Sequence, residues 1–219
     1  MSRKKLVRFA QNEANPNVIQ AGKPIFEQIK GKWNEMQFGN PQPLVVELAC
    51  GRGEFTLGLG RAYPGKNFIG VDIKGSRIWK GSSTASREGL HNIAFLRTQI
   101  QQLDSFFAFG EISELWITFP DPFPRDGDEK RRLTSTKFLE MYKNLLKSGG
   151  NIHFKTDNTG LFDFTLELLL SRKDTIIHAG TSDFYQSEYR EEHLGIQTRY
   201  EKIFSEKGEK IKYLRFSFR

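Results

Sequence analysis

The sequence predicts one α/β domain built on a mostly parallel sheet that ends in an antiparallel hairpin. Three observations lead to this prediction. The length of 219 residues fits a single domain of this kind. From Pro43 onward, short apolar runs alternate with stretches of helical periodicity. Near the C-terminus, two strand-like runs flank a short polar turn.

The alternating part predicts five strands and four helices. Strands are expected over residues 44–49, 67–71, 92–97, 115–119 and 151–155, and helices over 53–63, 74–89, 133–147 and 158–171. This order is typical of a parallel sheet wrapped by helices, in which ligands gather at the carboxyl ends of the strands. At the end of the chain, residues 199–205 and 210–218 are predicted to pair as the hairpin.

The first part of the chain predicts less structure. Residues 1–22 indicate a flexible basic N-terminal arm, with Arg3–Lys5 near its start. A leading helix is expected over residues 24–37, because apolar side chains recur there at helical spacing. Residues 23–219 are therefore predicted to form the single folded domain.

Composition restricts the classes of function. A net charge of +7 favours a polyanionic partner such as nucleic acid. The one cysteine, Cys50, excludes an intrachain disulfide and a CxxC zinc site, and the four histidines show no ligand spacing, so no metal is expected. No apolar run is long enough to span a bilayer, and none follows the basic start as in a secretory signal. We expect a cytoplasmic protein that does not use a membrane.

The first candidate site is the turn after the first predicted strand of the sheet. Glu47 lies near the end of this strand, and Gly51 and Gly53 follow before the next helix. Glycines there allow a ligand to approach the backbone closely. A carboxylate at this position can accept a hydrogen bond from a cationic amino group but would repel a pyrophosphate. The alternative interpretation is a turn that needs glycine only for its conformation.

The second candidate is Asp72, at the end of the next predicted strand. An acid about twenty residues beyond such glycines can hydrogen-bond the hydroxyls of a ribose. Asp72 thus predicts a nucleoside cofactor without saying which one. Its alternative role is to cap the helix that begins near Lys74.

The third candidate is Asp121, in the loop Thr118–Arg125 after the fourth strand of the alternating part. Three prolines within five residues stiffen this loop and fix Asp121 between Pro120 and Pro122. A rigid carboxylate beside aromatic side chains is suited to gripping a flat base. Lys130–Arg132 follow and offer phosphate contacts, unless they only solvate the start of a helix.

Two further segments contribute polar residues. Asp157 follows the fifth strand and could either cap the next helix or reach the cleft. Thr198–Glu201 enter the predicted hairpin and are uninformative by themselves.

Taken in order, these motifs resemble those of the bacterial tRNA (guanine-N7)-methyltransferase family. The resemblance covers about residues 27–216. It depends on the following segments: Lys30–Glu35, the Glu47 turn, Phe68–Lys74, Thr118–Arg125 with Lys130–Thr134, Phe154–Asn158, and Thr198–Glu201.

The resemblance implies a class I S-adenosylmethionine-dependent methyltransferase fold and a guanosine of the tRNA variable loop as target. It implies that the cofactor is bound by Glu47, Asp72, Gln99 and Asp121, beside Gly51 and Gly53. It implies that Asp121 is catalytic. It further implies that the tRNA is contacted by Arg125, Asp157, Thr198, Arg199, Tyr200 and Glu201.

The chain departs from the family pattern at several positions. Ala49 replaces a usual glycine, Gln99 a usual aspartate, Phe123 a usual tryptophan and Arg125 a usual lysine. Asp126–Asp128 replace a basic stretch, which weakens the local positive field. These departures bear on tRNA affinity rather than on the type of reaction.

Three other functions stay open from the residues alone. One is an amino-group methyltransferase, whose usual loop has the aromatic and the second proline exchanged relative to Asp121–Pro124. The others are a nicotinamide oxidoreductase, disfavoured by Glu47, and a non-catalytic RNA-binding module. The sequence is compatible with a monomer or a homodimer, and it indicates no obligate protein partner.

Overall fold

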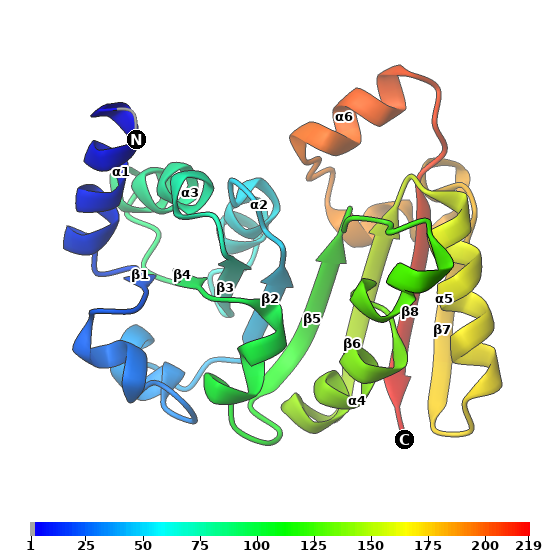
Figure 1. The fold of residues 1–219 in the computed structure, drawn as a ribbon, viewed down its shortest axis with the longest axis horizontal. Helices are drawn as coiled ribbons and strands as arrows, with labels where there is room; N and C mark the ends of the chain where they lie inside the picture. Colours follow the sequence, from blue (N-terminus) through cyan, green and yellow to red (C-terminus); the bar gives the residue numbers. More distant parts are fainter. Residues whose placement is uncertain (1–2) are drawn as a thin grey trace.

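The computed structural model describes residues 3–219, with the side chains of all of them except Arg3, Lys4 and Asp126. Eight strands form one sheet in the order β1-β4-β3-β2-β5-β6-β8-β7 (Figure 1). The strands are β1 (Val18–Ile19), β2 (Leu44–Leu48), β3 (Asn67–Asp72), β4 (Ile93–Arg97), β5 (Ile112–Thr118), β6 (Leu146–Thr156), β7 (Thr175–Thr181) and β8 (Lys212–Phe218). Strands β1 to β6 are parallel, and β8 runs antiparallel to both β6 and β7.

Helices cover both faces of the sheet. The α-helices are α1 (Arg3–Ala14), α2 (Glu54–Ala62), α3 (Gly75–Arg87), α4 (Thr136–Leu145), α5 (Thr159–Ser171) and α6 (Arg199–Glu206). Shorter turns of 3₁₀ or π type are η1 (Pro24–Glu27), η2 (Trp33–Phe38), η3 (Ile100–Ser105), η4 (Asp126–Arg131), η5 (Phe184–Gln186) and η6 (Glu188–His193).

Alternate residues of the strands feed two separate cores. Val46 of β2 and Ile69 of β3 belong to a core shared with α4 and α5. Val45 and Phe68 point the other way, into a core shared with α2 and α3. Burial on both faces explains the nearly continuous apolar runs in the sequence. The predicted α/β fold with an antiparallel end is confirmed, and the nine predicted elements between residues 44 and 171 occur with shifts of a few residues.

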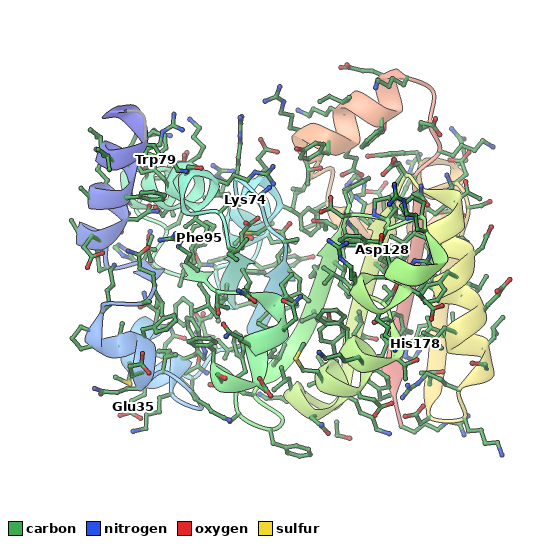
Figure 2. The ribbon with its side chains drawn as sticks, viewed as in Figure 1. Glu35, Lys74, Trp79, Phe95, Asp128 and His178 are labelled. Atoms are coloured by element: carbon green, nitrogen blue, oxygen red, sulfur yellow. The ribbon has the colours of Figure 1, made fainter. Side chains whose placement is uncertain are left out.

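The N-terminal arm is the first correction. The predicted flexible arm is instead part of the folded domain over residues 3–22, because Arg3–Ala14 form α1, which packs on α3, and Val18–Ile19 add β1 to the sheet beside β4. Trp79 of α3 points toward α1 (Figure 2), where its Nε1 donates to Gln11 at 2.6 Å. The basic composition of this segment hid its structure, since α1 is held by a few polar and cation–π contacts. Residues 1 and 2 lie outside the described residues.

The predicted leading helix over residues 24–37 is the second correction. Two short turns, η1 and η2, replace it, and a break over residues 28–32 separates them. Gly31 has a φ of 76° there, which is incompatible with a continuous right-handed helix. The apolar spacing is still meaningful, because Trp33 is fully buried and its Nε1 donates to the carbonyl of Phe106 at 2.8 Å.

The C-terminal hairpin is the third correction. Residues 199–206 form helix α6 rather than a strand, and β8 pairs with β6 and β7 instead. Thr198 and Glu201 form a capping box at the start of α6, with reciprocal bonds between each side chain and the other residue's backbone N–H. The Thr-x-x-Glu pattern favours a helix start more strongly than the aromatic residues around it favour a strand.

Between residues 3 and 219, no helix is long and apolar enough to cross a membrane. Within the same residues, no group of three or more His, Cys, Asp or Glu side chains is arranged to hold a metal ion.

The packing of α1 leads to a prediction about stability. Asn12 is fully buried, and its Nδ2 donates to the carbonyl of Gly75 at 2.8 Å. Replacing Asn12 by Ala leaves that carbonyl without its partner, so we expect the free energy of unfolding to fall by about 1 kcal/mol. Urea denaturation measures this change. Val7→Ala, on the exposed side of α1, is the control and should stay within about 0.5 kcal/mol of wild type. Equal stabilities of the two variants would mean that α1 is not docked.

Candidate cofactor and base-binding site

The candidate residues gather at the carboxyl edge of the sheet. In register, Leu48 at the end of β2 lies between Val71 of β3 and Ile117 of β5, and Thr118 pairs with Lys155 of β6. The turns that follow these strands therefore meet along one edge. Lys74, just after β3, lies on this side of the molecule (Figure 2).

Asp72 is fixed by two backbone donors. Its Oδ2 accepts from the N–H of Gly51 at 3.0 Å, and its Oδ1 accepts from the N–H of Lys74 at 2.7 Å. Asp72 thus forms a local turn before α3 and ties β3 to the glycine turn. The capping alternative is wrong, because the N-cap of α3 is Lys74 and, among the described residues, no side chain caps this helix. Each carboxylate oxygen of Asp72 keeps further lone pairs, so its contact to a ribose stays a prediction. Beside it, Ile73 is 52% exposed, an unusual position for a large apolar side chain.

The glycine turn needs its glycines for two reasons. Gly51 and Gly53 have φ values of 59° and 70°, in the left-handed region. A Cβ on Gly53 would also lie only 2.5 Å from Cε1 of Phe95, which packs beneath the turn. Ala49, in place of the family's glycine, adopts a φ of 55° and carries the strain of a left-handed alanine.

Glu47 lies inside the edge rather than at its surface. The residue is 3% exposed. Its Oε1 accepts from the Thr118 hydroxyl at 2.7 Å, and its Oε2 accepts from the Thr56 N–H at 2.9 Å and from the Thr56 hydroxyl. Burial raises the pKa of Glu47 to about 7, and the three donors act against that rise. Glu47 connects the start of α2 to the end of β5, close to the loop that carries Asp121.

The Asp121 loop is held in a strained conformation. Phe119 and Phe123 have φ values of 51° and 43°, in the left-handed region that bulky residues rarely adopt. Such strain often marks a functional site. Asp121 is exposed between them, and within residues 3–219 no side-chain hydrogen bond or ion pair occupies its carboxylate.

The basic segment after the loop has a structural role. The guanidinium of Arg131 lies 4.3 Å from the ring centroid of Phe123 and pairs with Asp128 at 2.9 Å. Arg132 donates from Nε to the carbonyl of Phe123 at 3.2 Å. These two arginines hold the loop, and Lys130 remains exposed beside them. Arg125 is exposed at the start of η4.

The predicted substrate residues of α6 divide into two groups. Arg199 and Tyr200 are exposed, and Thr198 is half-buried at the helix cap. Glu201 is fully buried, and its Oε1 lies 2.5 Å from Nζ of Lys155, which is also fully buried. The Tyr185 hydroxyl donates to the same oxygen at 2.7 Å. In this arrangement both carboxylate oxygens of Glu201 are engaged inside the protein, Oε1 by Lys155 and Tyr185 and Oε2 by the N–H of Thr198.

Asp157 is half-buried just after β6. Burial raises the pKa of its carboxyl group. Asn158, not Asp157, caps α5, because Asn158 Oδ1 accepts from the N–H of Leu161 at 2.8 Å. The capping alternative for Asp157 is therefore wrong, and its side chain remains a candidate for the cleft.

Several residues of this region are not among the predicted ones. Lys155 and Tyr185 contact Glu201, Phe119 lies beside Lys155, and Ile73 is exposed beside Asp72. A lysine inside an apolar strand was a usable signal, because lysine is almost never fully buried unless it is paired. Gln99 is exposed after β4, at the same edge of the sheet.

This fold and this edge define a Rossmann-like, class I methyltransferase. The fold matches the crystal structure of the 16S rRNA methyltransferase KamB with a TM-score of 0.61, covering 91% of this chain and 97% of that one at 15% identity. The structure of the 16S rRNA (adenine(1408)-N(1))-methyltransferase from Catenulisporales acidiphilia matches with a TM-score of 0.61 at 12% identity, covering 86% of this chain and 92% of that one. At these identities the likeness concerns the fold alone.

Sequence comparisons give the family. A family model described as "Putative methyltransferase" matches residues 41–214. The tRNA (guanine-N(7)-)-methyltransferase of Cytophaga hutchinsonii is 48% identical over 100% of this chain and 99% of its own length. The enzyme of the same name from Bacteroides thetaiotaomicron is 43% identical over 99% of this chain and 86% of its own. The chain therefore belongs to the bacterial tRNA (guanine-N7)-methyltransferase family, as its motifs indicate.

The buried carboxyl of Glu47 predicts a pH dependence of stability. Folded Glu47 keeps its proton up to about pH 7, whereas its ordinary pKa is 4.5, so the native state binds more protons between these values. The free energy of unfolding then falls as pH rises through this window. Glu47→Gln removes this contribution, so the variant should gain up to about 3 kcal/mol relative to wild type between pH 4.5 and 7.

Urea denaturation at several pH values measures this difference. Groups common to both proteins, such as His153, whose pKa burial lowers to about 4, cancel in the comparison. Glu167→Gln, an exposed acid on α5, is the matched control and should show no relative change. A difference between Glu47→Gln and wild type that does not vary with pH would contradict the prediction.

The Lys155–Glu201 pair predicts strong coupling in a double-mutant cycle. Either Lys155→Met or Glu201→Gln leaves one buried charge without its partner, which should cost about 3–5 kcal/mol of unfolding free energy. The double variant should lose much less than the sum of the two. Denaturant unfolding of the four proteins measures the coupling. Additive losses, or a double variant that unfolds when the single variants fold, would show that the pair does not act as a unit.

Proposed function

We propose that this protein transfers a methyl group from S-adenosylmethionine to N7 of a guanine in tRNA, at a guanosine of the variable loop. The observation that carries the proposal is an exposed, unoccupied carboxylate, Asp121, on a strained loop at the edge that also holds Asp72 and the glycine turn. Membership of the family adds the identity of the reaction, because its named relatives are tRNA (guanine-N(7)-)-methyltransferases.

The residues at the edge fit S-adenosylmethionine. Asp72 has acceptor capacity left for ribose hydroxyls, and the exposed Ile73 offers an apolar surface for an adenine. Gln99, exposed after β4, has an amide oxygen that can accept from an adenine amino group. At Gly51 and Gly53 the ligand can approach the backbone without meeting a side chain. When bound, the cofactor supplies a methyl group on a sulfonium, which a lone pair can attack directly.

In our proposal, Glu47 holds this site together from inside the protein and does not contact the ligand directly. Because its carboxylate is taken up by Thr56 and Thr118, it fixes the distance between the glycine turn and the Asp121 loop. Its partial negative charge at neutral pH also favours a nearby cationic ligand. This role differs from the direct contact that the family resemblance implies.

Asp121 acts on the guanine by electrostatics. Guanine N7 has a lone pair and no proton to lose, so the reaction needs no general base. Methylation leaves the purine with a positive charge, and a fixed carboxylate lowers the energy of that charge as it forms. Asp121 can also accept from guanine N1–H and the exocyclic amine, which adenine cannot offer in the same pattern. The prolines on both sides keep the carboxylate in place before the base arrives.

The exposed residues around the edge are suited to holding tRNA. Arg125 is the last residue of the Asp121 loop, and Arg199 and Tyr200 lie at the start of α6, facing solvent. Guanidinium groups bind phosphates, and an exposed tyrosine can stack on an unpaired base. We propose Thr198 and Asp157, both partly buried, as the inner members of this set. A tRNA substrate agrees with the expected cytoplasmic location, and no metal takes part in the proposed chemistry.

Asp121→Asn tests the proposal most directly. The variant keeps the shape of the side chain and removes its charge, so we expect turnover to fall by about 100- to 1000-fold, as for loss of one preorganised electrostatic group. Cofactor affinity should fall less. The measurement is single-turnover methylation of tRNA with both substrates saturating, followed by analysis of the methylated nucleoside.

Asp104→Asn is the matched control, because Asp104 is an exposed acid in η3. This control should keep the rate of wild type. If Asp121→Asn also keeps it, Asp121 only anchors the loop. A product other than 7-methylguanosine, for instance a base methylated on its amino group, would overturn the proposed function itself.

A further inference from the structure

A second cationic surface lies beside the proposed site and shares only Arg199 with the residues proposed above to hold tRNA. It is a groove of about 650 Å³ between α2, α3 and the start of α6. Five of its lining residues are basic: Arg52, Arg61, Lys80, Arg199 and Lys202. We call it the α2–α6 groove. In Figure 1, α2 and α3 lie beside each other near the carboxyl ends of β2 and β3, and α6 lies above the carboxyl ends of β5 and β6.

The acidic groups near the groove do not neutralise it. Glu54 is its one acidic lining residue, and its Oε2 accepts from the N–H of Arg199 at 2.6 Å. Arg61 pairs with Glu88 at 2.6 Å, outside the groove. Among the ion pairs formed by residues 3–219, none includes Arg52, Lys80 or Lys202, and all three are exposed. Positive charge is therefore concentrated and available there.

The floor of the groove is closely packed. Gly58 of α2 packs against Ile196, so closely that a Cβ on Gly58 would lie 2.5 Å from Cγ2 of Ile196. Ile196 immediately precedes the segment that caps α6, and the buried Lys155–Glu201 pair holds that helix. The cations on the two walls are thus kept at a defined separation, which is a condition for recognising a ligand that carries several charges.

We propose that the α2–α6 groove binds the phosphate backbone of the tRNA next to the target guanosine. This inference rests on the proposed function and adds to it the path that the RNA takes over the protein. Three features favour a nucleic-acid backbone: several cations, an open groove without a deep cavity, and continuity with the substrate edge through Arg52 after Gly51 and through Arg199. A run of phosphates can meet cations on both walls at once, whereas one small anion could meet only a few.

The test compares two pairs of lysines with the same change of charge. Lys80→Ala/Lys202→Ala removes one cation from each wall of the groove. Lys147→Ala/Lys173→Ala is the control, because both lysines are exposed and lie at the opposite end of the sheet, at the start of β6 and just before β7. The probe is unmodified tRNA, and its dissociation constant is measured over a series of salt concentrations. Methylation kinetics are measured in parallel.

We expect the groove pair to lower the slope of log affinity against log salt by about 1.5, since each lost phosphate contact removes about 0.7–0.9. At about 0.1 M salt, affinity should fall by about ten-fold or more, with KM for tRNA rising accordingly. The kcat at saturating tRNA and the affinity for S-adenosylmethionine should stay as in wild type. The control pair should change the slope by less than half as much. A charge-reversed groove pair, Lys80→Glu/Lys202→Glu, should enlarge the loss.

The outcomes separate this inference from the proposed function. Equal salt slopes and equal KM values for the groove and control pairs overturn the inference, even if wild type forms 7-methylguanosine. The groove would then bind another partner, such as an acidic peptide. If wild type binds tRNA without methylating it, the proposed function fails while the slopes still decide about the groove. A groove pair that lowers kcat at saturating tRNA without changing KM would also contradict the inference.

Discussion

The buried ion pair between Lys155 and Glu201 determines how the substrate side of this protein is assembled. Lys155 lies at the end of β6 with no exposed surface, and its Nζ lies 5.6 Å, 5.9 Å and 4.9 Å from the ring centroids of Phe55, Phe119 and Phe184. These rings come from α2, from the Asp121 loop and from η5. A charge in such surroundings costs several kcal/mol unless a partner is present, so Glu201 must stay inside, and α6 with it. Thr198 and Arg199 are thereby positioned through a residue that need not touch the substrate.

The same lysine also supports the Asp121 loop through its backbone. Its carbonyl accepts from the N–H of Phe119 at 2.9 Å, at the point where the chain enters the left-handed conformation that begins the Asp121 loop. Arg132 and Arg131 then hold Phe123 at the other end of that loop. An unfavourable backbone conformation persists only where its surroundings over-determine it. Two fixed ends and intervening prolines meet that condition, and they explain how an exposed carboxylate can remain rigid without a hydrogen bond of its own.

The sequence predicts the central strands and helices of the fold correctly, but not the N-terminal segment or the segment before the last strand. The difference has a physical reason. The strands from β2 to β6 are buried on both faces, so local hydrophobicity decides their conformation and the pattern is readable. Helix α1 is different, because it is held by contacts such as Asn12 to Gly75 and Gln11 to Trp79, which join residues more than sixty positions apart. The aromatic residues of 199–205 predict a strand there, although the Thr-x-x-Glu pattern of a capping box is visible in the sequence. Which charges lie inside, as Glu201 does, depends on a long-range pairing that periodicity cannot reveal.

The basic side chains near the site fall into two groups, those engaged by partners within the protein and those that are not. The net charge of +7 alone indicates only a polyanionic partner. In the structure, Lys155, Arg131 and Arg132 are engaged by Glu201, Asp128 and the carbonyl of Phe123, so they maintain the site rather than attract a ligand. Lys80, Lys202 and Arg52 have no such engagement among the described residues and face one groove. The acidic stretch Asp126–Asp128 lowers the net positive charge beside the Asp121 loop. If both proposals hold, the groove attracts the RNA and the Asp121 loop acts on the base, and the buried pair beneath α6 holds Arg199, which the two surfaces share.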